Sequence, residues 1–325
     1  MTSIELKTYN KPLLSVAVVL SALVAVYALE QAWPALGWWV FVVLTLSLGM
    51  GHGALDAVLL LAQFVPKSKA LLFSAGYLLL VLLTGWVLSW SLGLALLALI
   101  AMSLWHFGEL QGDIVSRIAV GGASVMAPML VAPTQMAGLV QPLLASDQFA
   151  AWLAWHWLAI AWVILVIVWL TYWLVRYASQ MQTYKQIKTQ AHIDWRLSWS
   201  QPQVRAVLEI AGVVGLYAIF SPLLAFALYF GVWHSVNHIA QVQQAVSRHY
   251  AVSARYYAAA VMGSTVLTLV FLAMLWLFLR STSWLAQDNS VTVLQWLIVA
   301  LAALTLPHLL LVSHSRHWLK NQKSP

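Results

Sequence analysis

The sequence predicts an all-α, polytopic bundle of transmembrane helices that forms a single integral membrane domain over residues 1–325. Hydrophobic residues make up 62% of the chain, charged residues make up 8%, and the mean hydropathy is +0.85. Soluble domains contain roughly 45–50% apolar and about 25% charged residues. Apolar runs of about 20 residues, the length that crosses a bilayer as a helix, recur from one end of the chain to the other. The chain is therefore expected to fold only in a lipid bilayer.

About ten spans are expected, with eight as the lower limit of the count. The first run follows Lys11 and has no small-residue cleavage site behind it, so it is expected to be a span and not a removable signal peptide. Pro128 and Pro133 predict a kink in the fifth span, because proline lacks a backbone N–H. The expected limits are 12–29, 36–64, 70–89, 91–113, 118–144, 150–176, 204–220, 222–247, 256–279 and 291–314.

The basic residues predict the orientation of the spans. Lysine and arginine collect before the first span and after every second span, and Arg280 is the exception. Because cytoplasmic loops carry an excess of Lys and Arg, both termini are expected to be cytoplasmic, in a bacterial inner membrane. The basic residues do not gather on one amphipathic face, so binding to nucleic acid is not expected.

The chain contains no cysteine. This excludes disulfides, iron–sulfur clusters and thiolate metal sites. Any metal must therefore be bound by His, Asp or Glu.

Histidines inside the predicted spans share one depth. His52 lies in the second span, His106 in the fourth, His234 and His238 in the eighth and His308 in the tenth, and these spans all run from outside to inside. Each histidine is roughly 12–17 residues from the outer end of its span, a spread of about 8 Å along the membrane normal. Ionisable residues are costly in a membrane and indicate function by default. We predict a shared metal site at His52, His106, His234 and His238, with His308 as a further candidate.

Other polar residues accompany these histidines. Asp56 lies four residues after His52, and Glu109 lies three residues after His106. A carboxylate can accept the free ring N–H of a metal-binding histidine, and both are better placed to do so for a histidine on a neighbouring helix. Asp56, Glu109 and Asn237 are therefore predicted to orient the ligands.

Small and aromatic residues lie at the same depth. Gly49, Gly51 and Gly53 surround His52 and permit close helix approach. The aromatic residues that flank the layer are candidates for a substrate pocket: Trp105, Phe107, Tyr229, Phe230 and Trp233.

Four sequence strings carry a resemblance to a known family. They are Gly51-His52-Gly53-Ala54-Leu55-Asp56, Trp105-His106-Phe107-Gly108-Glu109, Trp233-His234-Ser235-Val236-Asn237-His238 and Pro307-His308. In order and spacing, across nearly the whole chain, they resemble the Brp/Blh family of bacterial and archaeal membrane proteins. The resemblance implies a β-carotene dioxygenase that uses Fe(II) and O2 to split the central double bond into two molecules of retinal, the chromophore of microbial rhodopsins. It also implies that His52, His106, His234 and His238 bind the iron.

Three other functions use similar residues. A di-iron membrane hydroxylase or desaturase typically needs about eight histidines, more than this chain has at one depth. A membrane electron carrier with a bis-histidine haem also places paired histidines on facing helices. An ion or proton transporter would use a relay of His and carboxylate side chains. Imidazole also binds Zn, Cu and Ni, so the spacing of the histidines leaves the identity of the metal open.

Overall fold

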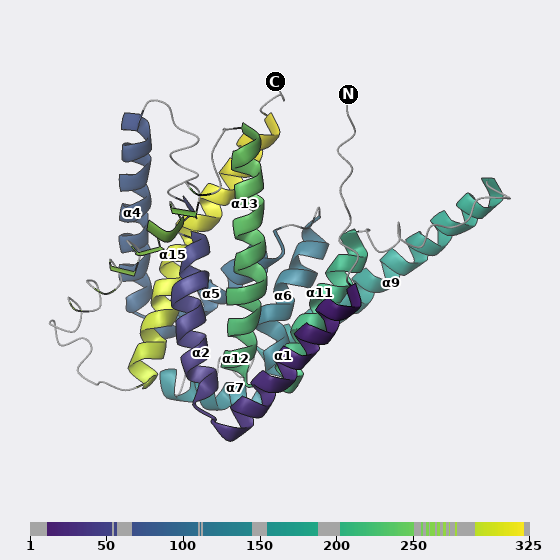
Figure 1. Ribbon diagram of the computed structural model, residues 1–325, viewed down its shortest axis with the longest axis horizontal. Coiled ribbons are helices and arrows are strands. Elements are labelled where there is room, and N and C mark those ends of the chain that lie inside the picture. Colours follow the sequence, from purple (N-terminus) through teal and green to yellow (C-terminus); the bar gives the residue numbers. More distant parts are fainter. Residues whose placement is uncertain are drawn as a thin grey trace.

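A computed structural model (Figure 1) describes residues 12–53, 55–56, 67–109, 111, 113–144, 155–187, 202–249 and 290–321, with scattered positions between 255 and 277. All elements within these residues are helical, as predicted. In chain order they are α1 (Pro12–Ala32), α2 (Leu36–Leu44), the π-helix η1 (Thr45–Gly49), α4 (Lys67–Ser89), α5 (Leu92–Phe107), α6 (Ile114–Val131), α7 (Pro133–Val140), the 3-10 helix η2 (Gln141–Leu143), α9 (His156–Ile187), α11 (Pro202–Ile219), α12 (Pro222–Ala227), the π-helix η3 (Leu228–His234), α13 (Ser235–His249) and α15 (Ser290–Asn321).

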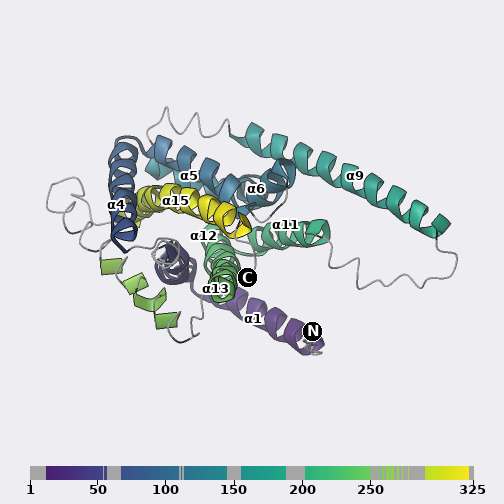
Figure 2. The same ribbon diagram turned by 90° about the horizontal axis from the view of Figure 1, so that it is seen from above.

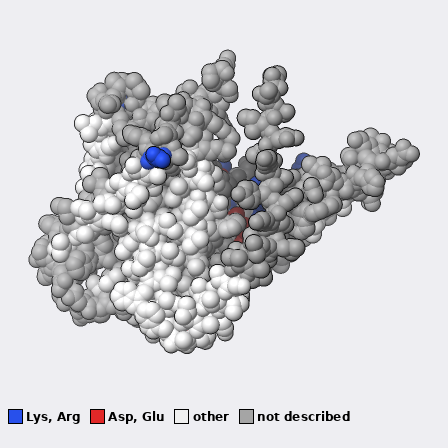
Figure 3. All heavy atoms as spheres, in the orientation of Figure 1, with Lys and Arg blue, Asp and Glu red and all other residues white. Residues whose placement is uncertain are grey.

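Six helical stretches of the described chain are long and apolar enough to cross a membrane. They are Leu36–Gly53, Leu71–Ser89, Ile114–Val131, His156–Ser179, Pro222–Gln243 and Thr292–His314. The outer helices α4 and α9 expose large apolar side chains, with Leu71 and Trp157 each 73% exposed. On the face drawn in Figure 3, the described surface is almost entirely uncharged. These features indicate a multi-pass membrane protein, because lipid is the solvent that accepts such a surface.

The predicted kink in the fifth span is confirmed. The helix breaks at Ala132, where φ is −131° and ψ is 52°, and Pro133 then starts α7. Proline is tolerated at this position because the first helical N–H has no partner within the helix. The structure differs in the sixth span, because α9 continues to Ile187 and extends away from the bundle in Figure 2. The ninth predicted span, at 256–279, lies largely outside the described residues.

The backbones of α5 and α6 touch at two glycines. A side chain at Gly121 would overlap the carbonyl oxygen of Leu104, and one at Gly108 would overlap the carbonyl oxygen of Arg117. In sequence, His106 lies between Leu104 and Gly108, the two residues through which this segment contacts α6. Close packing of α5 on α6 therefore sets the position of His106.

We expect Gly121→Ala to destabilise the protein by about 1–3 kcal/mol, the usual cost of overpacking a tight contact, and to reduce metal retention as α5 moves. Thermal unfolding in detergent and metal content measure the two effects. Gly212→Ala is the matched control, because nothing lies within 4 Å of its added methyl group. It should be neutral or stabilise α11 by up to about 1 kcal/mol, the difference in helix propensity. Equal stability of the two variants would contradict close backbone contact at Gly121.

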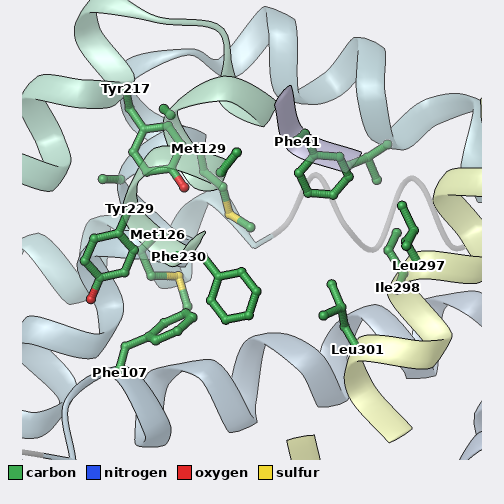
Figure 4. Packing of buried hydrophobic residues seen from close by; sticks show 14 of the residues in the cluster. Phe41, Phe107, Met126, Met129, Tyr217, Tyr229, Phe230, Leu297, Ile298 and Leu301 are labelled. Carbon is green, nitrogen blue, oxygen red and sulfur yellow. The ribbon is translucent and has the colours of Figure 1, made fainter. Parts of the chain in front are cut away.

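Two π-helices pack against each other in the interior. Gly49 of η1 faces the ring of Phe230 in η3, and a methyl group at Gly231 would lie 2.9 Å from Cβ of Leu44. The close approach expected around His52 is thus present at Gly49. Figure 4 shows Phe230 at the centre of the buried side chains, between Phe107 and Phe41. Since π-helical turns occur often at functional sites, this crossing directs attention to the histidines beside it.

A buried acid joins α1 to the beginning of α12. Glu30, which is 7% exposed, accepts the backbone N–H of Ser221 through both carboxylate oxygens, at 3.3 and 3.4 Å. An acid at the start of a helix satisfies a free N–H and interacts favourably with the helix dipole. Glu30 therefore stabilises the start of the segment that continues through η3 into α13.

Candidate metal centre

The structure brings the five intramembrane histidines together from four separate segments of the chain. The ring centroid of His52 is 5.2–5.8 Å from those of the other four. The rings of His234 and His308 each lie 4.8 Å from that of His106, and the rings of His238 and His308 are 5.4 Å apart. Side chains up to 256 residues apart in sequence thus face one volume.

His52, His106 and His308 form the tightest group. Each is 4–5% exposed, and one ring nitrogen from each lies within 4.8 Å of the others. His234 joins them through its Nε2, which is 3.1 Å from Nε2 of His106. His238 lies one turn further along, with its ring stacked at 6.1 Å from that of His234. The geometry therefore places His308 in the tightest part of the site, with His52 and His106.

A chain of hydrogen bonds orients His308. Its Nδ1 lies 2.8 Å from Oδ1 of Asp56, and the hydroxyl of Tyr77 donates to Oδ2 of Asp56 at 2.6 Å. Because a carboxylate can only accept, Nδ1 of His308 carries a proton, and in the neutral imidazole Nε2 then keeps its lone pair. Within the described chain, this buried Nε2 has no hydrogen-bond partner. A buried polar atom without a partner is costly, and a metal ion would satisfy it.

Ser235 orients His52 in the same way. Its hydroxyl lies 2.6 Å from the carbonyl oxygen of Phe230 and 3.1 Å from Nδ1 of His52. The single hydroxyl proton goes to the carbonyl, so the hydroxyl accepts from Nδ1–H of His52. Nε2 of His52 is then left with its lone pair, as in His308.

Glu109 lies beside His106. Its Oε2 is 3.4 Å from Nδ1 of His106, and the acid is 4% exposed. Asp56 reaches a histidine on another helix, as predicted, whereas Glu109 is next to the histidine one turn earlier in its own segment. The difference arises because the chain turns at Gly108, immediately after α5 ends.

The donor set fits a divalent transition metal. All candidate ligands are imidazoles, which suit Fe, Zn, Cu and Ni. Two neighbouring nitrogens that are each about 2.1 Å from one ion are separated by about 3.0–3.4 Å, and the His106–His234 separation is 3.1 Å. A haem between these two histidines would need its macrocycle between the nitrogens, and this separation leaves no room for it.

Three of the predicted pocket aromatics line the cluster. Ring centroids of Phe107 and Tyr229 lie 4.7 and 6.3 Å from that of His234, and the Phe230 ring lies 5.3 Å from that of His52. Figure 4 shows these three aromatic side chains gathered around Met126. They form one apolar wall beside the imidazoles.

The other two predicted pocket aromatics, Trp105 and Trp233, and the predicted orienting residue Asn237 face away from the cluster. Trp105 is 37% exposed, and Cζ of the Arg117 guanidinium lies over its indole ring, 5.0 Å from the ring centre. Trp233 is 55% exposed, and the exposed Asn237 donates to the carbonyl of Trp233 at 2.8 Å. Each of these three residues directly precedes a clustered histidine, and one residue rotates the side-chain direction in a helix by about 100°.

Comparison with known proteins identifies the family. Residues 41–315 match a family model described as beta-carotene 15,15'-dioxygenase. The chain belongs to this family. The predicted resemblance is thereby confirmed, and the match contains all five clustered histidines. No curated protein and no solved structure matches the chain.

Two residues that hydrogen-bond to the site of this dioxygenase-family protein were not predicted from the sequence. Tyr77 is one tyrosine in an apolar span, and nothing in its neighbourhood in sequence marks it. Ser235 lies inside the Trp233–His238 string, and its position next to His234 was the available signal. Both act through contacts with residues distant in the sequence, which no spacing rule reveals.

Proposed function

We propose that this dioxygenase-family protein binds Fe(II) in its histidine cluster and cleaves β-carotene at the central double bond, giving two molecules of all-trans-retinal. The observation that carries the proposal is the convergence of five imidazoles at one buried point of an apolar helix bundle. Family membership supports the substrate and the reaction. An iron site inside the membrane suits a hydrocarbon substrate that partitions into lipid.

The proposed iron ligands are the four histidines of the sequence strings, His52, His106, His234 and His238, with His308 as a fifth. Support for His308 comes from its buried Nε2, which has no hydrogen-bond partner among the described residues. Asp56, Glu109 and Ser235 would hold the protons of the opposite ring nitrogens, as outer partners of metal-bound histidines do. Asn237 is not included, because its amide group donates to a backbone carbonyl at the exposed side of α13.

The proposed reaction balances with O2 as the only co-substrate. The central C=C bond of the C40 substrate breaks and two C=O bonds form, so each C20 aldehyde takes one oxygen atom. Bound Fe(II) would supply the activation of O2. The chain itself orients the imidazoles and excludes water, with Phe107, Tyr229 and Phe230 as the apolar wall along which the polyene would lie.

We further infer ten spans with both termini cytoplasmic, in a bacterial inner membrane. The shared upward course of α2, α12–α13 and α15 in Figure 1 supports equal orientation of the site-bearing spans. A fluorescent protein fused to the C-terminus should be bright if that end is cytoplasmic, and an alkaline phosphatase fusion there should be inactive. Retinal released into the same membrane could supply a microbial rhodopsin, the functional partner that the family resemblance suggests.

In bacteria that accumulate β-carotene, expression of the protein should bleach the orange pigment and yield retinal. The expected product is C20 aldehyde alone, because a shift of one double bond would give two unequal products. Pigment chromatography measures the outcome, with anaerobic and iron-depleted cultures as controls. Persistent β-carotene despite membrane expression and bound iron would exclude this substrate, and unequal apocarotenals would exclude central cleavage.

A further inference from the structure

We propose that Glu209 is a positioning residue of the metal site. From α11 it holds the π-helix η3 through the hydroxyl of Tyr229 and thereby sets the direction of His234. This inference rests on the proposed function, because it assigns His234 to the iron. Glu209 lies outside all four sequence strings that carry the family resemblance.

The first step is the hydrogen bonding of Glu209. The hydroxyl of Tyr229 donates to its Oε1 at 3.2 Å. A carboxylate inside an apolar span is costly unless donors satisfy it. The hydroxyl of Tyr229, the second residue of η3, meets this requirement at Oε1 and attaches α11 to η3.

The second step is the position of His234. It directly follows Trp233 and is the last residue of η3. Its Nε2 lies 3.1 Å from Nε2 of His106, so a small rotation of the segment would separate them. Tyr229 is 1% exposed, and its ring packs edge-on against that of Phe107 at 5.4 Å, which fixes the ring whose hydroxyl donates to Glu209.

The third step is the register of η3. A π-helical turn contains one more residue than an α-helical turn, and such turns are rare because the α-helical register competes with them. A change of register by one residue rotates the following side chains by about 100°. The hydrogen bond of Tyr229 to Glu209 and the packing of the Tyr229 ring on Phe107 oppose this change. The carboxylate of Glu209 therefore stabilises the conformation in which His234 faces the cluster.

The test replaces Glu209 and measures the metal site directly. Glu209→Gln should weaken binding of Co(II), used as a spectroscopic probe, by up to about 10-fold, the lower end of the range for outer partners of metal ligands, because Glu209 acts through Tyr229 and does not contact a ligand itself. It should also change the visible ligand-field absorption of the Co(II) protein. Tyr229→Phe removes the donor of the hydrogen bond to Glu209 and should produce a change of the same kind. Combining it with Glu209→Gln should add little, since both act on the same Tyr229–Glu209 hydrogen bond: glutamine keeps an acceptor oxygen but loses the charge that strengthens the bond.

Tyr217→Phe is the matched control. Tyr217 lies on α11, as Glu209 does, and is 3% exposed. Its hydroxyl donates to the carbonyl of Ser124 at 2.7 Å. Losing this buried hydrogen bond should lower the thermal midpoint without altering Co(II) affinity or absorption. This separates general destabilisation from an effect on the metal site.

The outcomes distinguish the inference from the proposed function. Wild-type Co(II) affinity and absorption in Glu209→Gln would overturn the positioning role. If Glu209→Gln fails to insert into the membrane, wild-type affinity and absorption in Tyr229→Phe would overturn it instead. Altered absorption in a protein whose wild type binds Co(II) but leaves β-carotene intact would keep the positioning role and reject the proposed function. A wild-type protein that binds no Co(II) would overturn both.

Discussion

Replacement of His52, His106 or His308 by alanine is expected to remove bound iron and abolish retinal formation. These residues form the tightest part of the cluster, with one nitrogen of each within 4.8 Å of the others. Alanine offers no lone pair, and the remaining imidazoles cannot close the gap because their partners, such as Asp56 and Ser235, fix them. Iron content by elemental analysis and retinal yield by chromatography measure the effect.

His314→Ala provides the matched control for this series. His314 lies on α15 with His308 but is exposed. Its replacement should leave iron content and retinal yield at wild-type values. Stoichiometric iron with full activity in any variant of the first set would remove that histidine from the proposed site. His308 is the sharpest case, because the family resemblance assigns the iron to the other four histidines.

Asp56→Asn is expected to reduce iron affinity and turnover by about 10–100-fold without eliminating either. The carboxylate of Asp56 accepts from both His308 and Tyr77, at 2.8 and 2.6 Å. An amide keeps one acceptor oxygen but introduces an NH2 group, which cannot accept a hydrogen bond. His308 would then lose its fixed tautomer while remaining in place. Titration with an iron chelator and steady-state kinetics measure the two quantities.

Tyr77→Phe separates the parts of this network. It removes only the hydroxyl that holds Asp56, so a smaller loss is expected than for Asp56→Asn. In the Asp56→Asn background the same change should add little, because Tyr77 acts through Asp56. Additive losses would show that Tyr77 acts on the site by another route. Complete absence of iron in Asp56→Asn would instead make Asp56 a direct ligand.

The sequence allowed the fold class and the composition of the cluster to be predicted. Hydropathy determines which segments can enter lipid, and the positive charges give them alternating directions, so the depth of a histidine can be read from its distance to the end of a span. This placed His52, His106, His234 and His238 in one layer, with His308 beside them. It also predicted a kink in the fifth span from Pro128 and Pro133; the helix continues through Pro128 and breaks immediately before Pro133.

Depth does not determine which way a side chain points, and the remaining features depend on direction. Asn237 shares the layer but faces outward, and Glu109 lies beside His106 and not across the bundle. The two π-helices pack against each other across segments distant in sequence, with Gly49 against Phe230. Contacts of Tyr77 and Glu209 have the same origin, so pattern within one segment could not predict them.

The most direct measurement of the central claim is an oxygen-labelling experiment on purified protein of known iron content. Protein with one bound iron, given β-carotene under ¹⁸O2, should yield two molecules of retinal per β-carotene, each with one labelled oxygen. The aldehydes must be reduced chemically at quenching, before they exchange oxygen with water. The iron-free His106→Ala variant should yield none. Label in only half of the retinal would contradict dioxygenase chemistry, and retinal formation by the iron-free variant would contradict the histidine site itself.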